Sequence, residues 1–575
     1  MKRCPECRRD YYDDTLLYCL DDGNALLQGP ASAEEPGTAI LPGFGVPASG
    51  GSPSETATQP QIDTTDQTAI LPNRTGNIIP KPRGFDKRLL AAPFLLAAIV
   101  LSMFFGYRYV KPAGTEQVNS IAVLPFENKS GTADTDYLSD GLADSLIYRL
   151  SQLPNLKVSP TSSVMRYRGK ETDVAQIAKE LEVDAVMSGR LVQRNDDLSI
   201  SVQLIDSRTR KLIWAEQYDR KMADLLATQR EIATTITQKL QLKLAGSETK
   251  GITKKYTDSN EAYQSYLKGR YYWSRRTAEN IKKAIEQFKA ATDRDSNFAL
   301  AYAGLADCYV ILPEYAGIPS SETIPQATLY AERSIGIDDQ LAEPHASLGQ
   351  VYRQSWQWER SEQEFKRAIE LNSNYATAYH WYSHTLRALG RFDEAATIIK
   401  RGHEIDPLSS IIGVNLSEIY LLQDDFNASI ETNLKVIELD PNFSEAYRSL
   451  GLGYLKLGRN AEAIASLEKA VELTNRSSVT LMNLGYGYSM TEKRAEAIAV
   501  VKELEQKHAR KESPGLYIAG VYASLGDKDK AFEWLENDFR SRNGELSIIR
   551  WRVQFQSLRN DPRYRDLLKR MGLPE

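Results

Sequence analysis

The stretch SEAYRSLGLGYLKLGRNAEAIASLEKAVELTNR, residues 444–476, decides how the second half of this chain folds. Small residues stand at Gly451 and Ala463, and large apolar residues stand at Leu450 and Leu467. At helical spacing this pattern predicts two helices that pack closely against each other. The large side chains would fill the space toward a neighbouring pair of helices.

The same pattern recurs with a period of 34 residues. Blocks begin at Ala342, Ala376, Ser410, Ser444, Ser478 and Glu512. Two less regular blocks precede them, at 260–297 and 298–340, and the second is expected to contain an inserted loop, LPEYAGIPSSETIP. This periodicity resembles the tetratricopeptide repeat (TPR). The resemblance implies an all-α solenoid of about eight repeats over 260–544, with capping helices over 545–575.

In the TPR family, the first helix of each repeat lines a concave groove that binds a protein or peptide ligand. Carried over by repeat position, the groove residues would be Glu343, Gln350, Arg353, His380, His384, Arg387, Val414, Leu421, Leu452, Leu455, Met482 and Tyr486. This face changes from polar to apolar, which suits an extended peptide or a partner helix. The alternative is that some of these side chains only pack against neighbouring repeats.

Residues 118–246 alternate between short apolar segments and amphipathic ones, which predicts an α/β domain. We expect a helix from Gly141, capped by Asp140, and a hairpin turn at Asn195–Asp197. The segments IAVLPFENKSG, YLSDGLADSLIYRLSQLPNLKVSP, VDAVMSGRL and VQLIDSRTRKLIWAEQYDR resemble the TolB amino-terminal-like domain. That resemblance implies a compact mixed sheet without known catalytic residues.

A transmembrane helix is predicted at residues 89–110. The segment LLAAPFLLAAIVLSMFFGY, Leu89–Tyr107, contains no charged residue and is long enough to cross about 30 Å of hydrocarbon. Basic residues are more numerous before it (Arg74, Lys81, Arg83, Lys87 and Arg88) than after it (Arg108 and Lys111). The positive-inside bias therefore predicts a single-pass protein of the bacterial inner membrane, with a cytoplasmic N-terminus and a periplasmic or extracytoplasmic C-terminal bulk.

The first 28 residues are too few to fold by burial alone. Their pattern, C-P-x-C followed by Y-C-x-x-D-G, resembles a short bacterial zinc ribbon, which implies a structural Zn²⁺. The ligands would be Cys4, Cys7 and Cys19, with Asp22 in the fourth place and Asp21 as its competitor. The alternative is a degenerate ribbon that binds no metal. Residues 29–88, rich in Pro, Gly, Ser and Thr, would tether this module.

The sequence contains no recognisable catalytic motif. There is no phosphate loop and no kinase motif, and Cys308 is expected in a repeat core. His380 and His384 are four residues apart, a spacing that can bind a metal, but no third ligand is evident, so we interpret them as groove residues. A net charge of −5 gives no strong attraction to nucleic acid.

Together these features predict a multidomain fold: zinc ribbon, transmembrane helix, TolB-like α/β domain and TPR solenoid. The predicted function is a non-catalytic scaffold or signal-relay protein whose partners are a protein or peptide and the lipid bilayer, without a small-molecule substrate. The alternative is a transmembrane transcriptional regulator that acts through the zinc ribbon.

Overall fold

The computed structural model describes three short strands near the N-terminus and residues 118–574. Within the latter range, residues 131–134, 171–172, 243, 245 and 317 are not described. The strands are β1 Lys2–Arg3, β2 Asp10–Tyr11 and β3 Leu27–Gln28, paired antiparallel in the order β2-β1-β3. They belong to one compact unit, 1–107, and the rest of the chain forms a second, 108–575.

The predicted transmembrane helix at 89–110, the linker and the four predicted zinc ligands lie outside the described residues. Within the described part of the chain, no helix combines the length and the apolar character needed to cross a bilayer.

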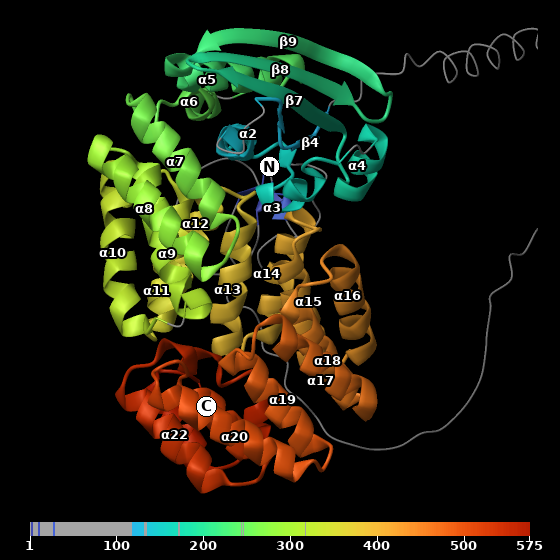
Figure 1. Cartoon of the computed structure of the whole chain (residues 1–575), viewed down its shortest axis with the longest axis vertical. Helices are drawn as coiled ribbons and strands as arrows, with labels where there is room; N and C mark the ends of the chain where they lie inside the picture. The colour runs from blue at the N-terminus through green and yellow to red at the C-terminus, as the bar shows by residue number, and fades with distance from the viewer. Residues whose placement is uncertain are drawn as a thin grey trace, which may run out of the picture. The chain divides into compact units, whose positions relative to one another are not determined.

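The second unit begins with a mixed sheet, drawn in blue-green in Figure 1. Its strands are β4 Ser120–Val123, β5 Glu127–Asn128, β6 Lys157–Val158, β7 Ala185–Arg194, β8 Asp197–Asp206 and β9 Lys211–Lys221. The order is β6-β4-β7-β8-β9, with β5 also paired to β7. Pairing is parallel from β6 to β7 and antiparallel from β7 to β9. This confirms an α/β region of mixed pairing.

Alternation of side chains explains why the sheet is covered on one face. In β8, Leu198, Ile200, Val202 and Leu204 are buried, while the residues between them are more exposed. Helices α2, Asp136–Ser151, and α5, Leu225–Lys239, contact each other and the sheet.

Two local predictions in this domain have different outcomes. The turn between β7 and β8 is tight, with Asn195 in the left-handed region at φ 55°, as asparagine tolerates. Asp140, however, does not cap α2, because the helix starts at Asp136 and places Asp140 in its second turn. There its carboxylate forms an ion pair with Arg168.

The rest of the domain consists of short helical elements. These are α3 Thr161–Val164, η2 Met165–Tyr167, α4 Val174–Leu181, η3 Met222–Asp224 and α6 Gly246–Thr253. The Asp173 side chain caps α4 by accepting a hydrogen bond from the backbone N–H of Ala175.

In the described part of the chain, eight helix pairs follow the α/β domain (Figure 1). The first four pairs are α7 Asn260–Trp273 and α8 Ala278–Arg294, α9 Ala299–Ala316 and α10 Ser320–Ile337, α11 Ala342–Gln354 and α12 Trp358–Leu371, and α13 Ala376–Ala388 and α14 Phe392–Ile405. The last four are α15 Ser410–Leu422 and α16 Phe426–Leu439, α17 Ser444–Lys456 and α18 Asn460–Leu473, α19 Ser478–Met490 and α20 Arg494–Ala509, and α21 Gly515–Ser524 and α22 Lys528–Arg540.

The repeat register follows the sequence closely. Five first helices begin at the predicted block starts, and the sixth, α21, begins at Gly515, three residues after the predicted start. Small residues permit the close packing, since a Cβ atom on Gly349 would lie 2.8 Å from the ring of Phe365. The predicted inserted loop is wrong, because α9 continues to Ala316 and α10 begins at Ser320. Most of LPEYAGIPSSETIP is therefore helical.

Residues 541–574, which follow α22, are called here the C-terminal segment. This segment forms η4 Gly544–Ile548, η5 Val553–Leu558 and α23 Pro562–Arg570. It packs on the last repeat and also reaches back to α11 and α13. The indole N–H of Trp358 donates to the Met571 carbonyl at 2.8 Å, and the Arg353 guanidinium donates to the Ser547 hydroxyl. The C-terminal segment thus connects the last repeat to the third and fourth.

The α/β domain is fixed against the solenoid by partly buried polar contacts and a continuous apolar core. Asn374 donates its side-chain N–H groups to the carbonyl oxygens of Ser151, Leu153 and Leu156 at 3.2–3.3 Å. The Arg270 guanidinium on α7 donates to the Asp144 carboxylate on α2 at 2.9 Å.

Candidate functional site

The first helices of the repeats surround a cavity of about 1730 Å³. Helices α7, α9, α11, α13, α15 and α17 contribute to its lining. The α/β domain contributes Asp144 and Thr161, among others, and the C-terminal segment contributes Glu545 and Trp551. The concave face of the solenoid is therefore bordered by two other parts of the same unit.

A buried cluster of charges lies in this lining, and we call it the guanidinium cluster: Arg387 of α13, Glu418 of α15, Arg448 of α17 and Arg552 of the C-terminal segment. All three guanidiniums donate to the single Glu418 carboxylate. The N···O distances are 2.7 Å for Arg387, 2.7 Å for Arg448 and 3.1 Å for Arg552. Three repeats and the C-terminal segment meet at this one carboxylate.

The electrostatics of the cluster follow from this geometry. Burial alone would raise the pKa of Glu418, but Arg552, Arg448 and Arg387 hold it well below its usual value, so Glu418 is ionised. Burial lowers the pKa of Arg387, and its like-charged neighbours Arg552 and Arg448 act in the same direction, opposed by Glu418. The cluster carries three positive charges against one negative.

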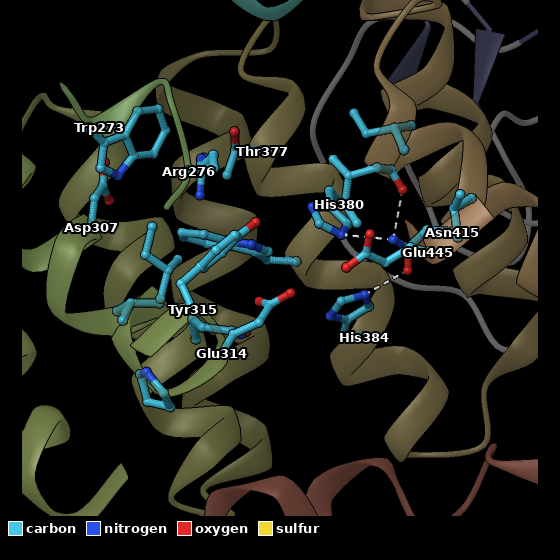
Figure 2. Close-up of a pocket in the computed structure, with 18 of the residues that line it drawn as sticks. Trp273, Arg276, Asp307, Glu314, Tyr315, Thr377, His380, His384, Asn415 and Glu445 are labelled. Atoms are coloured by element: carbon cyan, nitrogen blue, oxygen red, sulfur yellow. Dashed lines mark hydrogen bonds between the residues drawn. The ribbon is translucent and has the colours of Figure 1, made fainter. Parts of the chain in front are cut away.

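A hydrogen-bond network extends from the cluster to two histidines. Arg387 Nη2 donates to Asn415 Oδ1 at 2.6 Å, which fixes the orientation of the amide because a guanidinium only donates. His384 Nε2 donates to the same oxygen at 2.7 Å, and Asn415 Nδ2 donates to His380 Nε2 at 3.0 Å. Figure 2 shows the two histidines and Asn415 across the cavity from Glu314 and Tyr315.

Both histidines are neutral. Burial, reinforced by Arg387, lowers the pKa of His380 to about 3, and burial also lowers that of His384 well below its usual value. One ring nitrogen of each is already bonded to Asn415. Among the residues that the structure describes, no group of three or more histidine, cysteine, aspartate or glutamate side chains is arranged to hold a metal ion.

Three acidic side chains in the cavity lining have raised pKa values. Burial raises the pKa of Glu343 to about 7, helped by the nearby Asp307 carboxyl. Burial, together with Glu445 and Glu545, raises the pKa of Glu314 to about 7. Burial likewise raises that of Asp307 to about 6, although a hydrogen bond from Ser347 opposes it.

Of the twelve predicted groove residues, seven line the cavity: Glu343, Gln350, Arg353, His380, His384, Arg387 and Val414. The other five, Leu421, Leu452, Leu455, Met482 and Tyr486, are not part of its lining. Of these, Leu455 and Met482 pack in the hydrophobic clusters of the later repeats. Met482 is fully buried, with its sulfur 2.8 Å from where a Cβ atom on Gly520 would stand. In the later repeats, apolar residues at these positions serve packing.

Several polar residues of the cavity were missed by sequence reasoning. Glu418 and Arg448 occupy the same repeat positions as His384 and His380, so the 34-residue period could have identified them. Arg552 has no such signal, because it follows the last repeat and reaches the cavity only through the fold of the C-terminal segment.

Family comparisons agree with this architecture in two regions. Residues 116–235 match the model of the HilA/YgeH-like transcriptional regulator, second domain. Residues 376–407, 414–443 and 444–476 match the tetratricopeptide repeat. The chain thus contains TPR repeats, an architecture typical of protein interaction, behind a HilA-like domain. The more specific resemblance to TolB stays a prediction.

Individual proteins match only parts of the chain. "Putative adenylate cyclase 3" of Rhizobium meliloti (strain 1021) is 30% identical over 232 residues, which are 40% of this chain and 39% of that protein. The chain therefore spans well under half the length of this relative. Among solved structures, Pseudomonas aeruginosa pilF is 18% identical, with 36% of this chain and 92% of that chain covered and a TM-score of 0.29. YrrB, described as "a TPR protein with an unusual peptide-binding site", is 16% identical, with 34% of this chain and 97% of that chain covered and a TM-score of 0.25.

Proposed function

We propose that this protein is a non-catalytic, membrane-anchored scaffold that holds a protein or peptide ligand in the TPR groove. One observation carries the proposal: the concave face keeps a large cavity lined by charged and aromatic side chains from many repeats. Peptide recognition needs such a concave surface with a few fixed polar groups. Arg353, Arg387 and the two histidines supply such groups, and buried hydrogen bonds hold Arg353 and Arg387 in place.

Site-specific photo-crosslinking in the full chain tests the groove. A photoreactive phenylalanine analogue at Tyr315, which lines the cavity and is 37% exposed, should crosslink to the ligand in cells. The matched control is the same analogue at Leu329, which is 57% exposed on α10 and is not part of the cavity lining. Thr377→Trp, which fills cavity space, should abolish the Tyr315 adduct. Identical adducts at both positions, or an adduct that persists in Thr377→Trp, would refute groove binding.

The membrane anchor is supported by the uncharged segment Leu89–Tyr107 and the basic residues before it. A tag at the C-terminus should be removed when protease is added to spheroplasts. If the tag survives until the membrane is lysed, the proposed orientation is wrong.

The zinc site is supported by the Cys4, Cys7 and Cys19 pattern and by the pairing of β1 with β2 and β3, which brackets all three cysteines in sequence. Zinc bound there would fix the fold of a module that has too little core of its own.

A second function, transcriptional regulation, is favoured by the match of residues 116–235 to the HilA/YgeH-like domain. In this case the ribbon would contact DNA or the transcription machinery. The zinc-loaded full chain should then bind duplex DNA with an affinity that falls steeply with salt. A flat titration at low salt would exclude direct DNA binding.

A further inference from the structure

The guanidinium cluster has more positive charge than its internal carboxylate can balance. Arg387, Arg448 and Arg552 share Glu418, so two positive charges are in excess. Around the cluster, Arg353 and Arg276 add positive charge, and Glu545, Glu314 and Glu445 add negative charge. These neighbours reduce the excess but do not reverse it, because they carry charges of both signs in similar number. Like charges held together away from water repel strongly, so an arrangement of this kind favours a bound counter-anion.

The cluster also has unused hydrogen-bond donors. Arg387 Nε, Arg448 Nη1 and Arg552 Nε are buried and have no hydrogen-bond partner among the residues described in 118–574. The side chains of Arg387 and Arg448 are 1% and 6% exposed, and both line the cavity. Buried donors without partners are costly, and an oxyanion with several acceptor oxygens would satisfy them.

From the charge excess and these donors, we infer that the guanidinium cluster is a binding site for a phosphate monoester dianion. Such a group carries roughly −1.5 to −2 charges near neutral pH and presents three acceptor oxygens. It matches both the excess charge and the number of donor side chains, whereas a single carboxylate would leave one positive charge unbalanced. Arginine is suited to this role because its planar fork fits phosphate oxygens.

The surroundings define what can carry the phosphate. Trp551 lies beside the cluster, with the Arg387 guanidinium 5.0 Å from its ring centre and His384 stacked at 6.3 Å. The cavity is larger than the ~300–1,000 Å³ of usual small-molecule sites, so it has room for a phosphorylated peptide or for a small phosphate ester. The inference rests on the proposed role of the groove as a ligand site and names the chemistry recognised there.

Isothermal titration calorimetry on the full chain at neutral pH tests this inference. The probes are inorganic phosphate, phenyl phosphate, a phosphoserine peptide with its unphosphorylated form, and succinate. We expect saturable binding of phosphate and phenyl phosphate, weakened about tenfold or more in Arg448→Gln. Tighter binding by the phosphoserine peptide would identify a peptide source, and equal binding would identify a small ester. Arg540→Gln, an exposed arginine on α22 outside the cavity, should bind like the unaltered chain.

Glu418→Gln separates binding from a merely structural role. Removing the internal carboxylate adds one unbalanced positive charge, so phosphate should bind more tightly and raise the melting temperature more than in the unaltered chain. The inference is overturned if phosphate does not bind at up to about 10 mM, or if succinate binds as tightly as phosphate. It is also overturned if Arg448→Gln and Glu418→Gln both bind phosphate with the affinity of the unaltered chain. If phosphate does not bind but the crosslink at Tyr315 still forms, only this inference is wrong and the proposal of groove binding stands.

Discussion

Replacing Glu343 by glutamine should change the free energy of unfolding more favourably near pH 8 than near pH 5. Glu343 lies on α11, is 7% exposed, and its Oε2 atom has no hydrogen-bond partner among the described residues. Burial raises its pKa to about 7 from a usual value of 4.5. A carboxyl with a raised folded-state pKa favours folding when protonated. Its contribution is therefore complete below pH 4.5 and is lost as the pH rises to 7.

The size of the effect follows from the two pKa values. At 1.36 kcal/mol for each pKa unit, the difference corresponds to about 3 kcal/mol. Glutamine does not titrate, so any constant cost of its amide cancels when two pH values are compared. The free energy of unfolding of Glu343→Gln, minus that of the unaltered chain, should increase by up to about 3 kcal/mol between pH 5 and pH 8.

Urea unfolding of the full chain at pH 5, 6, 7 and 8, followed by circular dichroism, measures this difference. Glu438→Gln, an exposed glutamate on α16, is the matched control and should follow the unaltered chain at every pH. If the difference for Glu343→Gln stays constant or decreases as the pH rises, the carboxyl is not held neutral by burial and the reasoning is wrong.

Three further predictions concern packing, reactivity and metal. Gly349→Ala should lower the free energy of unfolding by about 1–3 kcal/mol, because its Cβ atom would press on Phe365, whereas Gly251→Ala, with open space around it, should not. Cys308 should resist iodoacetamide in the folded chain and react in urea, as seen by peptide mass spectrometry, because burial raises its pKa and excludes the reagent. The purified full chain should contain one zinc ion by elemental analysis, and Cys4→Ser should lose it.

Each of these predictions has an outcome that contradicts it. Equal stability of Gly349→Ala and the unaltered chain would mean that the third repeat can move apart without cost. Rapid alkylation of Cys308 would mean that its repeat opens readily. A zinc content that does not change in Cys4→Ser would remove that cysteine from the ligand set.

The sequence predicted the solenoid well because its information is local and repeated. Gly349 and Gly451 stand at the same repeat position, and each faces a large side chain of its partner helix. The start of α2 was harder to predict, because Asp140 is a residue type that caps helices and no local signal shows that the helix begins a turn earlier. The predicted inserted loop includes Pro313, yet this proline is accommodated inside α9.

Only part of the candidate site could be predicted from the sequence. Glu343, Arg353 and Arg387 follow from the repeat register and do line the cavity. Their charge balance could not be predicted, because it depends on Arg552, which no periodicity places. The apolar residues of the later repeats, such as Met482, look like groove residues by register but are used for packing between helices. Register alone does not distinguish these two roles.

The C-terminal segment changes how a repeat array of this kind should unfold. In an open solenoid each repeat contacts only its neighbours, so the ends can unravel independently of the middle. Here the bond from Trp358 to Met571 joins residues 213 apart in sequence, and the bond from Arg353 to Ser547 joins residues 194 apart. These contacts raise the contact order, and the distant repeats become parts of one cooperative unit. Loss of the last turns of the chain should therefore weaken the third repeat as well as the last one, although the third repeat is far from the cut in sequence.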